Sequence, residues 1–216
     1  PILWWSPDPR GVIELYADQT TNPDATPGYG GLHVSRRLAR TLRSGKFRVT
    51  VNQCFEEVMR ACGSERPEGT WVFSGDMVPG YAALHRLGHA HSVETWIRED
   101  GDGPALKELL TEPFVITEGG NSWLVEGSAK WRLAGGVYGV AIGGVFAAES
   151  MFYRVTDGSK VALAALVSRL RERGFALLDV QMKTAHTGTM GATEVPRKDY
   201  LKRLRAAVEM TGVSFV

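Results

Sequence analysis

The chain has 216 residues, of which 44% are hydrophobic and 23% are charged, so it can bury the core of one ordinary domain or of one domain with a small appendage. These proportions exclude disorder, collagen and coiled coil for the whole chain, and no apolar run approaches the roughly 20 residues that a membrane-spanning helix needs. The net charge of +1 indicates no partner by itself.

The compartment is predicted from cysteine usage and from the first residues. Cys54 and Cys62 are too few for a disulfide framework. Residues 1–10 have neither the basic start nor the apolar stretch of a signal peptide. We therefore expect a protein of the reducing cytoplasm with no membrane partner.

The first half of the chain predicts a loop followed by short helices and strands. Residues 11–31 contain turn-forming residues without periodicity, which predicts irregular structure. Hydrophobic spacing then predicts helices at 32–44, 54–62 and 81–87, the last ended by Gly88, and strands at 47–51 and 92–96.

Residues 97–131 are rich in glycine and proline and predict an inserted subelement, with a short helix at 105–110 and strands at 114–117 and 123–126. The last third has a clearer pattern. It predicts a hairpin of strands 133–142 and 145–153 turning at Gly143-Gly144, a helix at 160–173 capped by Asp157 or Ser159 and ended by Gly174, a strand at 176–180, and a helix from Pro196 to about 208. This order predicts a mixed α/β sheet.

Two basic clusters stand out against the balanced charge. The first has no acid between residues 32 and 51, and the second lies near the end of the chain. Their members are Arg36, Arg37, Arg40, Arg43, Lys46 and Arg48, and then Arg197, Lys198, Lys202, Arg203 and Arg205. Such clusters can attract phosphates, but charge alone favours the solvated face of an ordinary helix, because most basic stripes have no partner.

The histidines raise a metal hypothesis. His85 and His89 are spaced for one helix face and His91 follows, but Arg86 stands where a zinc protease has its glutamate and no nearby cysteine or acid completes the set. We expect structural histidines and no metal. The glycines of residues 135–139 lie in a strand-like run and predict a bulge or a close backbone approach.

Glu149 and Asp179 each lie within an apolar run that should be largely buried. A buried carboxylate requires either a function or a structural hydrogen bond, here to the backbone or to Arg154. The residues alone leave both readings open.

An ordered set of motifs supplies a resemblance. The set comprises Trp4-Trp5-Ser6-Pro7-Asp8-Pro9-Arg10, Leu32-His33-Val34-Ser35-Arg36, Gly69-Thr70-Trp71, Gly88-His89-Ala90-His91-Ser92-Val93-Glu94, Gly135 to Ala141, Glu149-Ser150-Met151-Phe152, Ser159-Lys160, Asp179-Val180-Gln181 and Gly191 to Arg197. Together these motifs closely resemble the leucyl/phenylalanyl-tRNA–protein transferase family over most of the chain outside residues 14–31 and 97–131.

The resemblance implies a fold and a reaction. The family's catalytic domain has the acetyltransferase-like (GNAT) fold, and it moves an aminoacyl group from charged tRNA to the N-terminal amine of a protein beginning with Arg or Lys. No cofactor is expected. Residues 1–31 are expected to be a remnant of the family's small N-terminal domain, and residues 32–216 the GNAT-like domain with an insertion at about 97–131.

The resemblance also implies roles for individual residues. Asp179 and Gln181 would help the attacking amine lose its proton, and Glu149 would line the site and hold a cationic amine or basic side chain. The apolar pocket for the Leu or Phe side chain would comprise Val137, Phe146, Ala148, Met151, Leu163 and Leu178, whose alternative role is plain core packing. The tRNA contacts would be Arg36, Arg37, Arg40, Arg43 and Trp71.

The chain departs from the family at Ala148, where the family usually has glycine. An added methyl beside an aminoacyl pocket favours a smaller or differently shaped group. Three other functions compete with protein aminoacylation: an aminoacyl-tRNA-dependent amide-forming enzyme of small-molecule biosynthesis, an acyl-CoA acetyltransferase and a non-catalytic tRNA-binding module. The acetyltransferase is disfavoured because residues 154–160 lack the pyrophosphate-loop spacing, and the binding module because Glu149, Asp179 and Gln181 are present.

Overall fold

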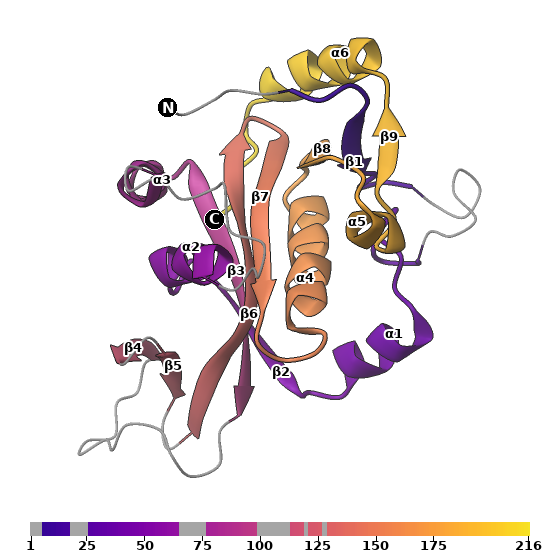
Figure 1. Ribbon diagram of the computed structural model, residues 1–216. Coiled ribbons are helices and arrows are strands. Elements are labelled where there is room, and N and C mark those ends of the chain that lie inside the picture. Colours follow the sequence, from indigo (N-terminus) through magenta and orange to yellow (C-terminus); the bar gives the residue numbers. More distant parts are fainter. Residues whose placement is uncertain (1–5, 18–25, 65–76, 99–112, 119–120, 127–128) are drawn as a thin grey trace.

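A computed structural model describes residues 6–17, 26–64, 77–98, 113–118, 121–126 and 129–216 (Figure 1). Its centre is one mixed sheet in the order β2-β3-β6-β7-β8-β1-β9, with β5 pairing β6 and β4 pairing β5. The strands are β1 (Arg10–Ile13), β2 (Phe47–Val51), β3 (Ala90–Arg98), β4 (Phe114–Glu118), β5 (Asn121–Glu126), β6 (Ala129–Ile142), β7 (Val145–Tyr153), β8 (Leu177–Gln181) and β9 (Thr193–Val195). The predicted mixed α/β class is therefore confirmed.

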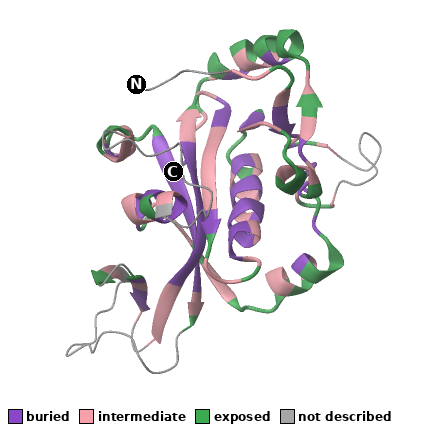
Figure 2. Cartoon of the chain, viewed as in Figure 1, coloured by how far each residue is buried: buried purple, intermediate pink, exposed green. Residues whose placement is uncertain are grey.

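Helices cover both faces of the sheet (Figure 1). They are α1 (Arg36–Arg43), α2 (Phe55–Ser64), α3 (Met77–Arg86), α4 (Gly158–Glu172), α5 (Ala185–Thr189) and α6 (Arg197–Val208). One hydrophobic cluster lies between the sheet and α4, and a second lies under α2 and α3. Figure 2 shows that α4 and the middle of the sheet are the most deeply buried parts.

The hairpin β6–β7 turns at Gly143-Gly144 as the sequence predicts, because Gly143 has a positive φ of 54° that side chains rarely adopt. All strand pairs are antiparallel except β7 with β8, which are parallel and connected through α4. The long strand β6 pairs with β7 along residues 135–142 and with β5 along residues 129–132.

The predicted strands and helices are confirmed with small shifts of their ends, and the differences have identifiable causes. Residues 11–31 are not irregular throughout, because residues 10–13 form β1 between β8 and β9. The helix predicted from residue 32 begins at Arg36, where Ser35 caps it by accepting a hydrogen bond from the Leu38 amide. The helix predicted at 105–110 lies outside the described residues.

Asp157 occupies the N-cap position of α4, but it does not cap the helix with its side chain. Its φ of 72° turns the carboxylate away, and that carboxylate accepts a hydrogen bond from the Thr41 hydroxyl at 3.1 Å. The predicted N-cap position is therefore confirmed, but the predicted side-chain hydrogen bond to the helix is not formed. The sequence does not predict helix α5 or strand β9, because each is too short to show periodicity.

Candidate active site

The parallel strands β7 and β8 diverge inside the sheet. They pair from Val145 opposite Leu177 to Ala147 opposite Asp179, and the pairing among the described residues stops there. Glu149 and Gln181 each stand two residues beyond the last pair. Polar side chains at the start of such a gap can reach a ligand while the paired strands hold them in place.

Each of the two strands has a bulge at this level. In β7 Glu149 is the extra residue, since Tyr138 faces Ser150 and Gly139 faces Ala148. In β8 the register shifts beside Val180, and Gln181 takes a positive φ of 66°. Bulges re-aim side chains and are frequent next to active sites, so these two turn Glu149 and Gln181 out of the regular alternation.

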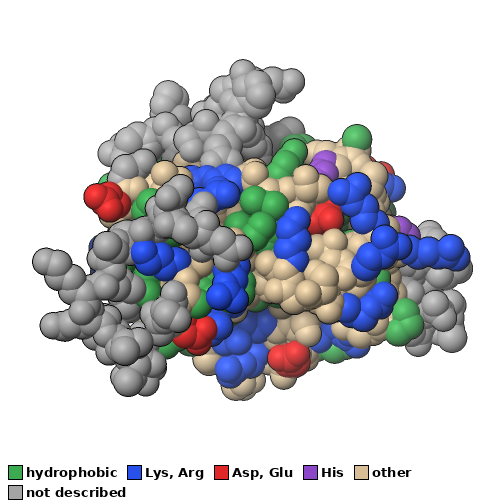
Figure 3. All heavy atoms as spheres, turned by 90° about the horizontal axis from the view of Figure 1, so that it is seen from below, with side chains coloured by type: hydrophobic (Ala, Val, Ile, Leu, Met, Phe, Trp, Pro, Cys, Tyr) green, Lys and Arg blue, Asp and Glu red, His purple; other side chains and the backbone are tan. Residues whose placement is uncertain are grey.

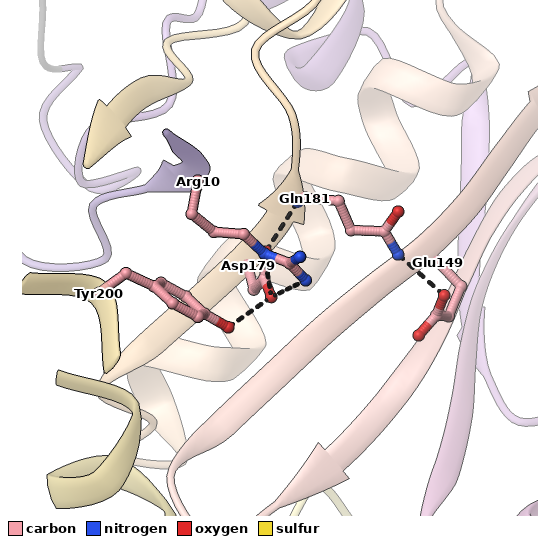
Figure 4. A network of polar contacts seen from close by, with 5 residues as sticks. All are labelled: Arg10, Glu149, Asp179, Gln181 and Tyr200. Carbon is pink, nitrogen blue, oxygen red and sulfur yellow. Dashed lines mark hydrogen bonds and ion pairs between the residues drawn. The ribbon is translucent and has the colours of Figure 1, made fainter. Parts of the chain in front are cut away.

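Asp179 is almost fully buried and is held by several donors (Figure 4). The Arg10 guanidinium on β1 donates from Nε to Oδ1 at 3.0 Å and from Nη2 to Oδ2 at 2.7 Å. The Tyr200 hydroxyl on α6 donates to Oδ2 at 2.7 Å, and the main-chain N–H of Gln181 donates to Oδ1 at 2.7 Å. Asp179 therefore links β1, β8 and α6, and it orients the main chain that carries Gln181.

Glu149 and Gln181 meet across the gap between the strands (Figure 4). Gln181 donates from Nε2 to Glu149 Oε2 at 2.9 Å, and the Tyr81 hydroxyl of α3 also bonds to Glu149. Burial raises the pKa of Glu149 above its ordinary value, and the hydrogen bond from Gln181 opposes that rise. Burial together with Glu149 also raises the pKa of Tyr81.

The Gln181 amide oxygen has no hydrogen-bond partner in the part of the chain that the structure describes. Because Nε2 is committed to Glu149, that oxygen is the acceptor that the side chain presents to a ligand. An N–H group entering the gap would find the Gln181 oxygen and the Glu149 carboxylate together. The arrangement suits an amine nucleophile.

The six residues predicted to hold the aminoacyl side chain come together on the α4 side of the sheet. Val137, Phe146, Leu163 and Leu178 are buried there in one cluster, and Ala148 and Met151 are half-buried against it. Met151 also lines a cavity of about 480 Å³ next to β7.

The four predicted tRNA-contacting arginines Arg36, Arg37, Arg40 and Arg43 lie on α1 on the solvent side, while Leu38 of the same helix faces the core. Figure 3 shows that Lys and Arg side chains outnumber acidic ones on the face seen from below. Arg48, in contrast, pairs with Glu126, and Arg203 of the second basic cluster pairs with Glu14. Trp71 lies outside the described residues.

The histidines take part in local hydrogen bonds. His85 Nδ1 lies 2.7 Å from the Ala90 carbonyl oxygen, and its ring stacks on Phe55. His91 bridges the Asn52 amide and the Gly88 carbonyl, and burial lowers its pKa to about 4. Among the described residues, no three His, Cys, Asp or Glu side chains converge as metal ligands. No described helix is long and apolar enough to cross a membrane.

Sequence reasoning misses Arg10, Tyr81 and Tyr200 as members of the site. Arg10 has a usable signal, because a buried aspartate requires a charged partner and Arg10 closes the first motif of the resemblance. The two tyrosines carry no such signal. Tyr81 lies in a predicted helix far from Glu149 along the chain, and only the fold brings them together.

Comparison with known proteins matches this chain to one family. The family model described as leucyl/phenylalanyl-tRNA protein transferase matches residues 28–103 and 114–205. A relative of that name from Magnetococcus marinus is 41% identical over 209 residues, covering 96% of this chain and 71% of its own length. Those from Nitrosomonas europaea and Anaeromyxobacter sp. (strain K) are 40% and 42% identical, with 98% and 97% of this chain and 70% and 71% of the relatives covered.

Proposed function

Because the chain belongs to the leucyl/phenylalanyl-tRNA–protein transferase family, we propose that it transfers an aminoacyl group from aminoacyl-tRNA to the N-terminal amine of a protein that begins with Arg or Lys. The observation that carries the proposal is the 2.9 Å contact between Gln181 and Glu149 across the gap between β7 and β8. This contact places the free amide oxygen of Gln181 beside the Glu149 carboxylate, whose hydrogen-bond donors are neutral. An amine between the two groups can be held and partly deprotonated.

The reaction is aminolysis of an activated ester. The amine nitrogen forms a bond to the ester carbonyl carbon, the bond from that carbon to the tRNA ribose oxygen breaks, and one amine proton ends on the departing oxygen. The amine must be neutral and in line with the carbonyl. The Gln181 amide oxygen accepts an N–H of the nucleophile, Asp179 fixes the Gln181 main chain, and Glu149 holds the cationic acceptor group.

The donor side chain occupies the apolar cluster on the α4 face in this proposal. Val137, Phe146 and Leu178 would form its floor, while Met151 and Ala148 lie toward the gap. The family name indicates Leu or Phe as the donor group. We also assign the sheet to the GNAT fold, which the divergence of the parallel pair β7–β8 supports, and we place the reaction in the cytoplasm, where aminoacyl-tRNA is available.

A transfer assay tests the proposal directly. Radiolabelled Leu-tRNA or Phe-tRNA is offered to a peptide beginning with Arg, to the same peptide with an acetylated N-terminus, and to small amines. We expect label only on the free peptide, and a Gln181→Ala loss of roughly a hundredfold in kcat, typical of a group acting on a transferred proton. Label on small amines but not on peptides would replace the protein acceptor with a small-molecule one.

The tRNA contact on α1 has its own test. Changing Arg36, Arg40 and Arg43 together to Gln should weaken aminoacyl-tRNA binding and reduce the log–log salt slope by roughly one unit for each phosphate that no longer meets an arginine. Lys198→Gln and Lys202→Gln on α6 are matched controls, since these lysines are exposed on another helix. If the slope is unchanged, α1 is a solvated helix face.

A further inference from the structure

Glu94 on β3 is a fully buried carboxylate that the proposed reaction does not use. The Thr50 hydroxyl donates to its Oε2 at 2.6 Å, and the Ser92 hydroxyl donates to its Oε1. The main-chain N–H groups of Gln53 and Cys54 donate to it as well. Four donors fill the acceptor positions that an ionised carboxylate offers, so Glu94 has a role within the fold rather than toward a ligand.

Glu94 fixes the start of helix α2. Gln53 and Cys54, whose N–H groups donate to it, are the two residues directly before that helix. N–H groups at this end of a helix have no partner within the helix, and the helix dipole favours a carboxylate there. Asn52 ties the same turn to β3, because its side-chain oxygen accepts from the main-chain N–H of Ser92 at 2.9 Å. The position of α2 is therefore set from β3.

The first residue of α2, Phe55, connects this position with α3. Its ring stacks on the His85 ring with the centroids 4.4 Å apart, and it meets the Tyr138 ring edge-on at 5.9 Å. The Tyr81 ring also meets Tyr138 edge-on, at 5.6 Å. Because His85 and Tyr81 are four residues apart on α3, they share one face of that helix. One aromatic cluster thus joins the start of α2 to Tyr81.

This cluster ends at the proposed acceptor site, because the Tyr81 hydroxyl bonds to Glu149. A hydrogen bond weakens steeply as its geometry departs from the optimum, so a small displacement of α3 would weaken this contact. Close-packed rings have little free space in which to absorb such a displacement. A change at the start of α2 should therefore reach Glu149 through Phe55 and α3.

We propose that Glu94 is a positioning residue for acceptor binding, which holds the start of α2 and, through Phe55 and α3, keeps the Tyr81 hydroxyl on Glu149. The proposal rests on the proposed function for the identity of the acceptor, but the placement of Tyr81 can be measured without any transfer. It also explains the buried carboxylate, since an apolar side chain of the same size would accept none of these hydrogen bonds.

The first measurement follows Tyr81 itself. The whole chain is labelled with 3-fluorotyrosine, and the fluorine resonance of residue 81 is identified as the one that Tyr81→Phe lacks. We expect Glu94→Gln to shift this resonance, because the substitution replaces an acceptor by a donor and loosens the start of α2. Phe55→Leu removes the ring between α2 and α3 and should shift it too, and this variant serves if Glu94→Gln does not fold.

Val167→Ala is the control, because this buried residue of α4 lies on the opposite face of the sheet (Figure 1). It should lower the melting temperature and leave the resonance of residue 81 in place.

The second measurement is the acceptor KM in the transfer assay. Glu94→Gln should raise KM by roughly three- to tenfold, the range for one lost hydrogen bond, with kcat within about twofold. In a Tyr81→Phe background the same substitution should raise KM by less than about 1.5-fold, because the contact that it disturbs is already absent. A purely structural Glu94 would change KM by equal factors in both backgrounds.

An unshifted resonance in a folded Glu94→Gln or Phe55→Leu chain would overturn the proposal, as would an equal shift in Val167→Ala. Equal KM factors with and without the Tyr81 hydroxyl would also overturn it. A resonance that shifts in both variants of a chain that transfers no aminoacyl group would support the placement of Tyr81 by Glu94 and reject the proposed function.

Discussion

Asp179 and Glu149 lie on neighbouring parallel strands, yet their charges are balanced differently. Asp179 is buried against a bidentate arginine, a tyrosine hydroxyl and a main-chain amide. Glu149 is bonded by Gln181 and Tyr81, which are neutral donors. Burial raises the pKa of Glu149, whereas the charge of Asp179 already has its counter-ion in Arg10.

This difference indicates that Asp179 anchors the surrounding structure, whereas Glu149 is suited to bind a ligand. A buried carboxylate with an arginine partner and filled acceptors has no reason to attract another cation. A carboxylate that burial has partly desolvated, and whose hydrogen-bond donors are neutral, gains from an incoming ammonium. We therefore expect the Asp179 side to respond to mutation mainly in stability and in the placement of Gln181, and the Glu149 side mainly in acceptor binding.

The largest effect is expected for Asp179→Ala. Removing the carboxylate leaves the Arg10 guanidinium buried without its counter-ion, which costs about 3–5 kcal/mol in the free energy of unfolding. Amide formation should fall by roughly a hundredfold or more, because Gln181 loses its support. Urea denaturation measures the first effect and single-turnover transfer the second, and aminoacyl-tRNA affinity should stay nearly intact.

A second variant separates stability from placement. Asp179→Leu combined with Arg10→Met removes both charges and should regain most of the lost stability while transfer remains low. Normal turnover in that folded double variant, or in folded Asp179→Ala, would remove Asp179 from the mechanism.

Glu149→Gln tests the other half of the comparison. The KM for the acceptor peptide should rise by about tenfold or more, as expected when one charge-assisted hydrogen bond is removed. Because the folded pKa of Glu149 is raised, its ionisation destabilises the fold as pH rises through the interval from its ordinary pKa to the raised one. The variant should therefore melt higher than the parent at pH 8 and equally at pH 4, and equal melting at both values would contradict the buried charge.

Matched tyrosine substitutions give a smaller contrast. Tyr200→Phe removes a hydrogen bond to the anchored Asp179 and should cost about 1.5–3 kcal/mol in unfolding free energy. Tyr81→Phe removes a bond to Glu149 at the gap, where an acceptor cation can compensate, so we expect a smaller loss of stability and a change in acceptor KM. Equal stability losses with unchanged KM would mean that the two carboxylates are anchored alike.

The sequence predicts the strands and helices that carry this site better than the contacts between its side chains. Long strands and α4 carry strong periodicity, and the turn at Gly143-Gly144 identifies the hairpin that holds Glu149. Glu149 and Asp179 are recognisable because charges are rare in apolar runs. The partners of Asp179 are not recognisable from the sequence, because Arg10 lies 169 residues from it and Tyr200 contacts it from helix α6.

The bulges are equally hidden in the sequence, because they arise from pairing between strands and leave no local pattern at Glu149 or Val180. The sequence predicts a loop at the short strand β1 for the same reason. This strand has four residues, and it is stabilised by pairing with β8 and β9 and by the Arg10–Asp179 contact rather than by its own propensity.

Ala148 lies on β7 between the part that pairs with β8 and Glu149. Changing Ala148 to glycine should have the smallest effect of these substitutions. It is half-buried against the α4-side cluster, so its methyl group can be both a pocket wall and a core contact. If Ala148 is a pocket wall, removing its methyl group should raise transfer of Phe relative to smaller aliphatic residues by roughly tenfold, which corresponds to about 1.4 kcal/mol. As a core contact alone, its removal should lower stability by about 0.5–1 kcal/mol, the usual cost of glycine in a strand, and leave that ratio unchanged. Competitive transfer and melting temperature measured on the same variant decide between these roles. An unchanged ratio with a lower melting temperature would place the aminoacyl group away from Ala148. The gap between β7 and β8 would then select the acceptor but not the donor.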